Sequence, residues 1–213
     1  MKRSQEPELM DDPAFAVDAR KEFHAELARL NRGLGNNKLI LERLRGKRPQ
    51  RVLDIGCGEG ALLAEIRDTL GAQVTGVDLY ADPAHTYGVE IIAGDATSIP
   101  LPHSDVAISL LTIHHLTEEQ IVALVKNVGR SSKRFLIVDL VRHPLPLALF
   151  SIFLRPFLNP LVLLDGQQSI RRAYTPDELR ALVVEGLTGT DAIFEQWVSP
   201  IYGKQVIDIS YRN

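Results

Sequence analysis

The sequence predicts an α/β fold built on an open, mostly parallel sheet with an antiparallel edge. Three observations predict it: short apolar runs that alternate with helical patterns, a glycine-rich turn after the first run, and two β-rich runs at residues 192–198 and 205–211. Strands that alternate with helices favour a parallel sheet. A chain of 213 residues, 45% of them apolar, has the material for one well-buried core. We therefore expect a single domain over residues 1–213.

The N-terminal part, residues 1–48, is predicted to be a helical cap. Its first ten residues are polar and are predicted to be loose. Apolar residues then recur at helical spacing, first at Phe23, Leu27, Leu30 and Leu34 and then at Leu39, Ile40, Leu41 and Leu44. Two amphipathic helices are therefore expected before the first strand, with a break near residues 33–37.

Residues 49–142 are predicted to hold the first five strands. The runs lie at residues 51–55, 73–78, 89–93, 105–110 and 134–140. Each is a short apolar run, typical of a strand buried on both faces of a parallel sheet. The helix after the first run is expected to end at Gly71, and Thr117 with Gln120 forms a capping box that begins the helix before the fifth run.

Residues 175–213 are predicted to form a last helix and a hairpin. Thr175 and Glu178 make a second capping box, and Pro176 lies at the first helical position between them. The runs at 192–198 and 205–211 are rich in β-forming residues and are joined by a short turn-forming stretch, the pattern of two paired antiparallel strands.

The net charge indicates the class of partner, and the cysteine content indicates the cellular compartment. The net charge is −3 and the isoelectric point is near 6.1, whereas nucleic-acid-binding proteins usually carry a clustered positive excess. A small-molecule substrate and no nucleic-acid partner are therefore expected. Cys57 is the single cysteine, and no secretion leader opens the chain, so we expect a cytoplasmic protein. The sequence carries no signal for an oligomeric state.

A glycine turn follows the first predicted strand. Gly56, Gly58 and Gly60 lie where open α/β sheets bind ligands, and glycine lets the backbone take positive φ and approach the ligand closely. With Ala61 the turn also satisfies the dinucleotide-binding pattern, and Asp78 stands about 20 residues on, where a ribose-binding acid is expected. An NAD(P)-binding oxidoreductase therefore stays open as an alternative.

Three carboxylates at strand ends favour a different cofactor. Asp54 ends the first strand, where its carboxylate is expected to hold turn amides and face a cationic ligand group. Asp78 ends the second strand, and Asp95 follows the third as an acceptor for an adenine amino group. Cys57, inside the turn, is interpreted as a small packing residue because no base lies beside it in sequence.

Five stretches together resemble, in order and spacing, the class I S-adenosylmethionine-dependent methyltransferases, particularly the ubiquinone and menaquinone methyltransferase-like branch. They are residues 52–60, 76–79, 94–96, 105–109 and 114–116. The resemblance implies S-adenosyl-L-methionine as cofactor and S-adenosyl-L-homocysteine as product. It also implies a Rossmann-like seven-stranded sheet of order 3-2-1-4-5-7-6, with strand seven antiparallel.

The resemblance also implies roles for single residues. The three glycines, with Cys57 beside them, would line the methionine and ribose part of the cofactor. Asp78 would take the ribose hydroxyls and Leu79 would pack on adenine. Asp95 and the amide of Ala96 would read the adenine edge, and Leu110 at the end of the fourth strand would complete the cofactor site.

His114 and His115 follow the fourth strand, beside the expected position of the transferred methyl group. A histidine suits deprotonation of a phenol or a carboxylic acid, so either residue is a candidate general base. The alternative is that the pair holds the loop or shapes the pocket. A metal-dependent site would need clustered carboxylates after the fourth and fifth strands. Only Asp139 lies there, so no metal is expected.

Residues 143–174 lie where such folds usually insert a substrate lid, and they are strongly apolar. This favours a hydrophobic or aromatic acceptor. Residues 165–179 resemble a subgroup of methyltransferases often met beside polyketide-type biosynthesis genes, which implies a phenolic or quinol acceptor methylated on oxygen or carbon. Arg172, Tyr174 and His143 are candidates to hold a substrate oxygen, although an ordered surface loop explains the first two equally well. Arg155 and four prolines interrupt the segment, which leaves at most a weak membrane-surface contact. A non-catalytic cofactor-binding regulatory module is the third alternative.

Overall fold

The computed structural model describes residues 1–9, 17–81, 86–201 and 203–212, without the side chains of residues 17–22 and 24. The helices are α1 (Val17–Gly33), α2 (Asn36–Arg45), α3 (Ala61–Leu70), α4 (Glu118–Ser131), α5 (Pro144–Phe153), α6 (Pro160–Arg172) and α7 (Pro176–Gly186), with a short 3-10 turn, η2 (Ile113–His115). The two N-terminal helices predicted from the apolar spacing are confirmed, and the break between them contains Gly35, whose φ is 71°.

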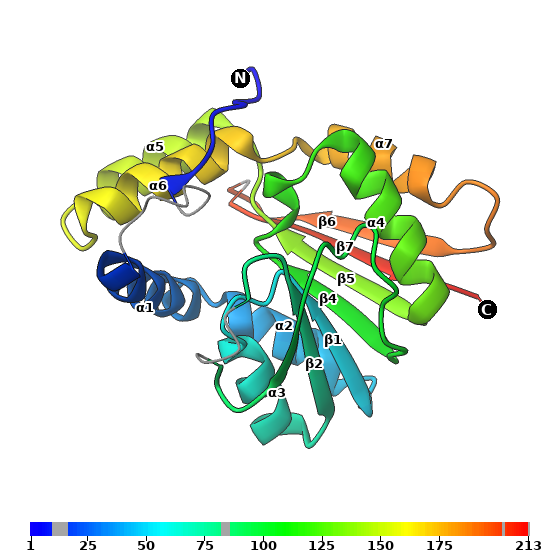
Figure 1. Ribbon diagram of the computed structural model, residues 1–213. Helices are drawn as coiled ribbons and strands as arrows, with labels where there is room; N and C mark the ends of the chain where they lie inside the picture. Colours follow the sequence, from blue (N-terminus) through cyan, green and yellow to red (C-terminus); the bar gives the residue numbers. More distant parts are fainter. Residues whose placement is uncertain (10–16, 82–85, 202, 213) are drawn as a thin grey trace.

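The sheet has seven strands in the order β3-β2-β1-β4-β5-β7-β6 (Figure 1). They are β1 (Arg51–Ile55), β2 (Gln73–Asp78), β3 (Glu90–Ala93), β4 (Val106–Leu110), β5 (Arg134–Asp139), β6 (Ile193–Val198) and β7 (Gln205–Ser210). β7 runs in the direction opposite to the other strands and pairs antiparallel with both β5 and β6. The predicted order and the reversed strand are confirmed, and predicted strand ends differ from the observed ones by at most one residue.

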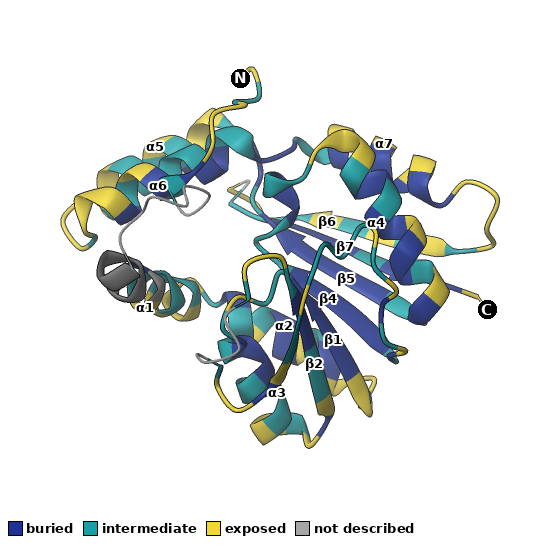
Figure 2. Cartoon of the chain, in the orientation of Figure 1, coloured by how far each residue is buried: buried dark blue, intermediate teal, exposed yellow. Residues whose placement is uncertain are grey.

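Helices cover both faces of the sheet, as the unbroken apolar runs predict. Side chains of β1 alternate: Val52 packs with α2 and α3, whereas Leu53 and Ile55 pack with α4 and α7. Figure 2 shows the central strands as almost continuously buried between these two layers. Burial on both faces therefore fixes the register of the strands whose carboxyl ends carry the site.

The starts of two helices are set by capping boxes. Thr117 Oγ1 accepts from the backbone N–H of Gln120, whose Oε1 accepts from the backbone N–H of Thr117. Thr175 and Glu178 make the same reciprocal pair at α7. Both predicted boxes are confirmed, and each satisfies two helix N–H groups that have no partner within the helix.

The apolar segment predicted as a lid folds into a helical hairpin. Helices α5 and α6 pack against each other, and Gly166 admits the ring of Phe150. The hairpin lies beyond the carboxyl end of the sheet, with α1 beside α6 (Figure 1). Several apolar side chains of the hairpin are exposed: Ile152, Phe153, Phe157, Leu161 and Leu164. Within the described ranges, no helix combines the length and the apolar character needed to cross a membrane.

Residues 1–9, which we call the N-terminal strap, run along α6. The prediction that this part of the chain is loose is wrong. The Ser4 N–H donates to the Arg171 carbonyl at 3.0 Å, and the Leu9 N–H donates to Asp165 Oδ1 at 2.8 Å. Arg3 donates to the carbonyls of His114 and Leu116. Polar groups of the strap therefore form hydrogen bonds with residues of α6 and around η2. The composition of the strap alone does not predict these bonds.

Candidate active site at the carboxyl end of the sheet

The glycine turn after β1 is left-handed at all three glycines, with φ of 72° at Gly56, 55° at Gly58 and 82° at Gly60. A Cβ atom at Gly56 would collide with the side chain of Thr112, and one at Gly60 would collide with Val89. A Cβ at Gly58 would meet no atom within 4 Å. Packing therefore explains two of the glycines, whereas Gly58 borders open space at the edge where ligands bind.

Asp78 links the ends of β1 and β2. Its Oδ2 accepts from the Gly58 N–H at 2.8 Å, and its Oδ1 accepts from the Tyr80 N–H at 2.9 Å. This corrects the expectation for Asp54, because the turn amide of Gly58 is held by Asp78. The next residue, Leu79, is 58% exposed, so its apolar side chain is open to solvent beside Asp78.

Asp54 is a buried carboxylate with an unused acceptor. Its Oδ1 has no hydrogen-bond partner among the described residues. Burial, together with the charge of Asp78, raises the pKa of Asp54 well above its ordinary value. A cationic ligand group would relieve this cost, because a buried charge is stable only when paired.

The other predicted cofactor residues lie near the ends of β1, β3 and β4. Asp95 Oδ1 accepts from the N–H and the hydroxyl of Thr97, so this oxygen caps its own turn. Ala96 follows in the same turn, and Leu110 is the last residue of β4. The Cys57 thiol packs against Gly76, and burial raises its pKa, so it stays protonated. These positions support Cys57 as a packing residue.

His114 is buried at the end of β4 and anchored to the end of β5. Its Nδ1 lies 2.6 Å from Asp139 Oδ1, and its backbone N–H donates to Asp139 Oδ2 at 3.1 Å. Nε2 lies 3.6 Å from Glu8 Oε1. Burial by itself would lower the pKa of His114, but Asp139 and then Glu8 outweigh burial and the opposing charge of Arg172, so the pKa is raised.

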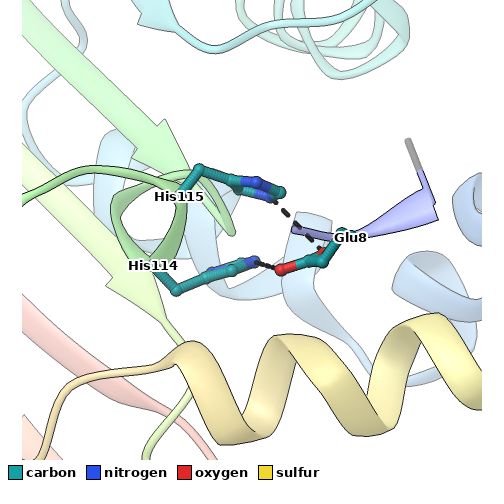
Figure 3. A group of neighbouring side chains, drawn as sticks. All are labelled: Glu8, His114 and His115. Carbon is teal, nitrogen blue, oxygen red and sulfur yellow. Dashed lines mark ion pairs between the residues drawn. The ribbon is translucent and has the colours of Figure 1, made fainter. Parts of the chain in front are cut away.

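Glu8 of the N-terminal strap faces both histidines with its carboxylate, as Figure 3 shows. His115 Nε2 is 3.7 Å from Glu8 Oε2, and the two imidazole rings are 4.4 Å apart. The Ser169 hydroxyl donates to Glu8 Oε2 at 2.6 Å, and Arg172 Nε lies 3.6 Å from Oε1. Glu8 was not predicted as a site residue, because a glutamate in a polar N-terminal stretch carries no local signal of burial.

The three predicted substrate residues have different surroundings. Arg172 reaches the histidine pair, since its Nη2 donates to the His115 carbonyl at 3.2 Å. Tyr174 is buried, and its hydroxyl donates to the Leu116 carbonyl, while the Arg3 guanidinium lies 4.0 Å above its ring. These contacts favour a structural role for Tyr174. His143 begins α5, where its Nδ1 accepts from the Leu145 N–H.

Glu8, His114 and His115 also offer side-chain atoms of the kinds that bind metals, all within 4.8 Å of one another. The three residues also contact other charged or polar groups. Ser169 and Arg172 contact the carboxylate, and Asp139 contacts the imidazole of His114. Arg172 lies near Glu8, and Asp139 lies near His114, so the cluster also forms a network of oppositely charged groups.

The sheet order is shared with solved methyltransferase structures, and part of the chain is similar to a methyltransferase family. Residues 52–134 match a family model described as a methyltransferase domain. An O-methyltransferase from Penicillium expansum, cnsE, is 31% identical over 150 residues, which cover 61% of this chain and 53% of that protein. The chain thus spans about half the length of this curated relative.

Solved structures share the fold across nearly the whole chain. The plantazolicin methyltransferase BpumL, in complex with a pentazolic desmethylPZN analog and SAH, has a TM-score of 0.71 and 17% identity, covering 96% of this chain and 93% of that one. Human N-acetylserotonin methyltransferase, in complex with SAM, has a TM-score of 0.63 and 18% identity, covering 93% of this chain and 57% of that one.

Proposed function

We propose that the chain transfers a methyl group from S-adenosyl-L-methionine to oxygen or carbon of a hydrophobic, aromatic small molecule. The observation that carries the proposal is the pair of carboxylates beside the glycine turn. Asp78 holds the Gly58 amide, and buried Asp54 keeps one acceptor without a partner among the described residues. The first fixes a ligand-binding turn, and the second matches a ligand that carries a positive charge.

The residues at the strand ends fit this cofactor. Asp78 would take the ribose hydroxyls, the Gly58 edge would lie along the ligand, and Asp54 would face a cationic group. Leu79 and Leu110 would supply apolar contacts, and Asp95 with the Ala96 amide would read the adenine edge. The antiparallel β7 also departs from the strand order 3-2-1-4-5-6 usual for dinucleotide-binding sheets, which disfavours the oxidoreductase alternative.

The bound cofactor supplies an already activated methyl group. The chain's own residues then have two tasks: to align the acceptor with that methyl group and to remove the acceptor's proton. His114 is enclosed between Asp139 and Glu8, whereas the side chain of His115 is 25% exposed. We therefore assign His115 as the general base and His114 as its fixed neighbour. Arg172 lies beside the pair, where it would contact the acceptor oxygen.

The acceptor class follows from the surface beyond the histidines. The exposed apolar side chains of α5 and α6 favour a hydrophobic acceptor, and the likeness to an O-methyltransferase supports oxygen as the methylated atom. A phenol or quinol combines an apolar body with an acidic hydroxyl. The same exposed residues support a weak contact with a membrane surface, which co-sedimentation with phosphatidylcholine vesicles would detect and a Phe157→Ser variant would weaken.

Two measurements test the proposed function in order. Isothermal titration with S-adenosylmethionine and S-adenosylhomocysteine should show micromolar binding, and no heat at high micromolar ligand would reject the cofactor. Mass spectrometry of reactions with a panel of alkylphenols and hydroquinones should then show a product heavier by one methylene unit. Binding without any product across the panel would favour the non-catalytic regulatory module, and NADH binding would favour the oxidoreductase.

A further inference from the structure

The N-terminal strap brings a charged side chain into the centre of the histidine cluster. Glu8 is buried, although it lies only a few residues after Met1 in a stretch that is otherwise polar and mostly exposed. Burying a carboxylate is costly unless charged or hydrogen-bonding partners surround it. Here the partners come from two places, η2 at the end of β4 and α6 of the hairpin.

Both imidazole rings direct Nε2 toward the same carboxylate. His114 approaches Glu8 Oε1 at 3.6 Å, and His115 approaches Oε2 at 3.7 Å (Figure 3). Ser169 and Arg172 fix the carboxylate from the α6 side. A carboxylate held in this way sets the orientation of the rings that face it, and it favours the protonated form of His114.

We propose that Glu8 is a positioning residue, which orients the His114–His115 pair toward the acceptor, so that the acceptor side of the site is complete only with the N-terminal strap in place. The inference rests on the proposed function. Asp139 holds His114 from the sheet and Glu8 holds it from the strap, and both carboxylates favour its protonated form. His115 has a carboxylate partner at Nε2 and a side chain that is 25% exposed, so we assign to it the proton exchange with the acceptor.

The charged groups around His114 predict how its pKa changes when the Glu8 charge is removed. Asp139 on β5 and Glu8 on the strap favour its protonated form, whereas Arg172 on α6 opposes it, and His115 is its neighbour on η2. The Arg3 guanidinium lies on the backbone side, at the His114 carbonyl. Loss of the Glu8 charge should therefore lower the pKa of His114.

The test compares Glu8→Gln, Glu8→Asp and Glu6→Gln in the full chain. Glu6 lies in the same strap with an exposed side chain, so Glu6→Gln removes an equal charge without touching the histidines. We expect Glu8→Gln to lower kcat on a 4-alkylphenol acceptor at least tenfold, which is part of the roughly 10²–10⁴-fold that a general base contributes. Its KM should change little, S-adenosylhomocysteine affinity should be kept, and Glu8→Asp should recover part of kcat.

A second measurement needs no acceptor. Nuclear magnetic resonance of ¹⁵N-histidine-labelled protein should show His114 titrating at lower pH in Glu8→Gln than in wild type, with Glu6→Gln unchanged. Unchanged kcat or an unchanged His114 titration in Glu8→Gln would overturn the inference. Failure of the wild type to bind S-adenosylhomocysteine would instead reject the proposed function, and the histidine spectra would still decide whether Glu8 positions the pair.

Discussion

The carboxylate of Asp78 and the backbone N–H of Gly58 form a 2.8 Å hydrogen bond that joins the end of β2 to the turn after β1. One acidic side chain thus shapes the backbone that borders the ligand edge and keeps lone pairs for the ligand itself. Loss of this single group is therefore expected to disturb both the shape and the chemistry of the site.

Replacing Asp78 with Asn should weaken S-adenosylhomocysteine binding by about 100-fold, since hydrogen bonds to a charged group contribute about 1.5–3 kcal/mol each. Isothermal titration measures the change. Asp68→Asn is the matched control, because Asp68 is an exposed aspartate on α3 that pairs only with neighbouring Arg67 in the described contacts. Equal affinities in the two variants would remove Asp78 from the cofactor site.

Gly58 and Gly71 give a comparison that separates backbone strain from ligand contact. Both have positive φ, and a Cβ at either position meets no atom within 4 Å. An alanine at each should cost about 1–2 kcal/mol of stability through left-handed strain. Only Gly58→Ala should also weaken cofactor binding. Thermal unfolding and titration of both variants test this, and equal loss of affinity would point to strain alone.

Asp54 should make the ligand-free protein less stable as pH rises. Its pKa is raised in the folded chain, so the folded state holds a proton that the unfolded state releases above pH 3.8. Stability is therefore lost from that pH upward toward the folded pKa. Asp54→Asn should raise the ligand-free Tm at pH 7 while weakening cofactor binding about tenfold, as expected for loss of one ionic partner. A lower Tm together with full affinity would contradict this assignment.

His114 should produce the opposite dependence at higher pH. Its pKa is raised above the ordinary 6.5, so its stabilising ion pairs are fully present below pH 6.5 and are lost as pH rises through the folded value. The difference in Tm between wild type and His114→Gln should shrink across that interval. His103→Gln, a change at an exposed loop position, supplies the control. A constant difference from pH 6 to pH 9 would show that His114 is not charged.

Chelation should leave the protein unchanged. The His114–His115–Glu8 cluster is balanced by Arg172 and Asp139, so we propose that no metal is required. Dialysis against EDTA should alter neither turnover nor Tm, and elemental analysis should find substoichiometric zinc. One zinc per chain, absent from Glu8→Gln, would instead identify the cluster as a metal site.

Local patterns in the sequence were enough to predict the strands, the helices and a mostly parallel sheet, whereas the strand order was predicted from the resemblance to a methyltransferase family. Apolar runs, glycine turns and the capping boxes at Thr117 and Thr175 each act over a few residues, and their outcome is confirmed in the fold. The histidine cluster was predicted only in part, because its partners are far apart in sequence. Glu8, Asp139 and Arg172 meet His114 through tertiary packing, and Leu111 takes φ of 55° at the end of β4 without any glycine to signal it. The ubiquinone and menaquinone branch stays a prediction.

The N-terminal strap also bears on how the molecule is made. Glu8 bonds Ser169, 161 residues later, so synthesis must reach the end of α6 before the carboxylate has its partner. Such long-range pairing is slow because the closure entropy is lost before any contact compensates for it. The sheet edge around the glycine turn involves shorter separations, such as the 20 residues between Gly58 and Asp78. During folding, the cofactor-binding turn should therefore form before the acceptor side of the site.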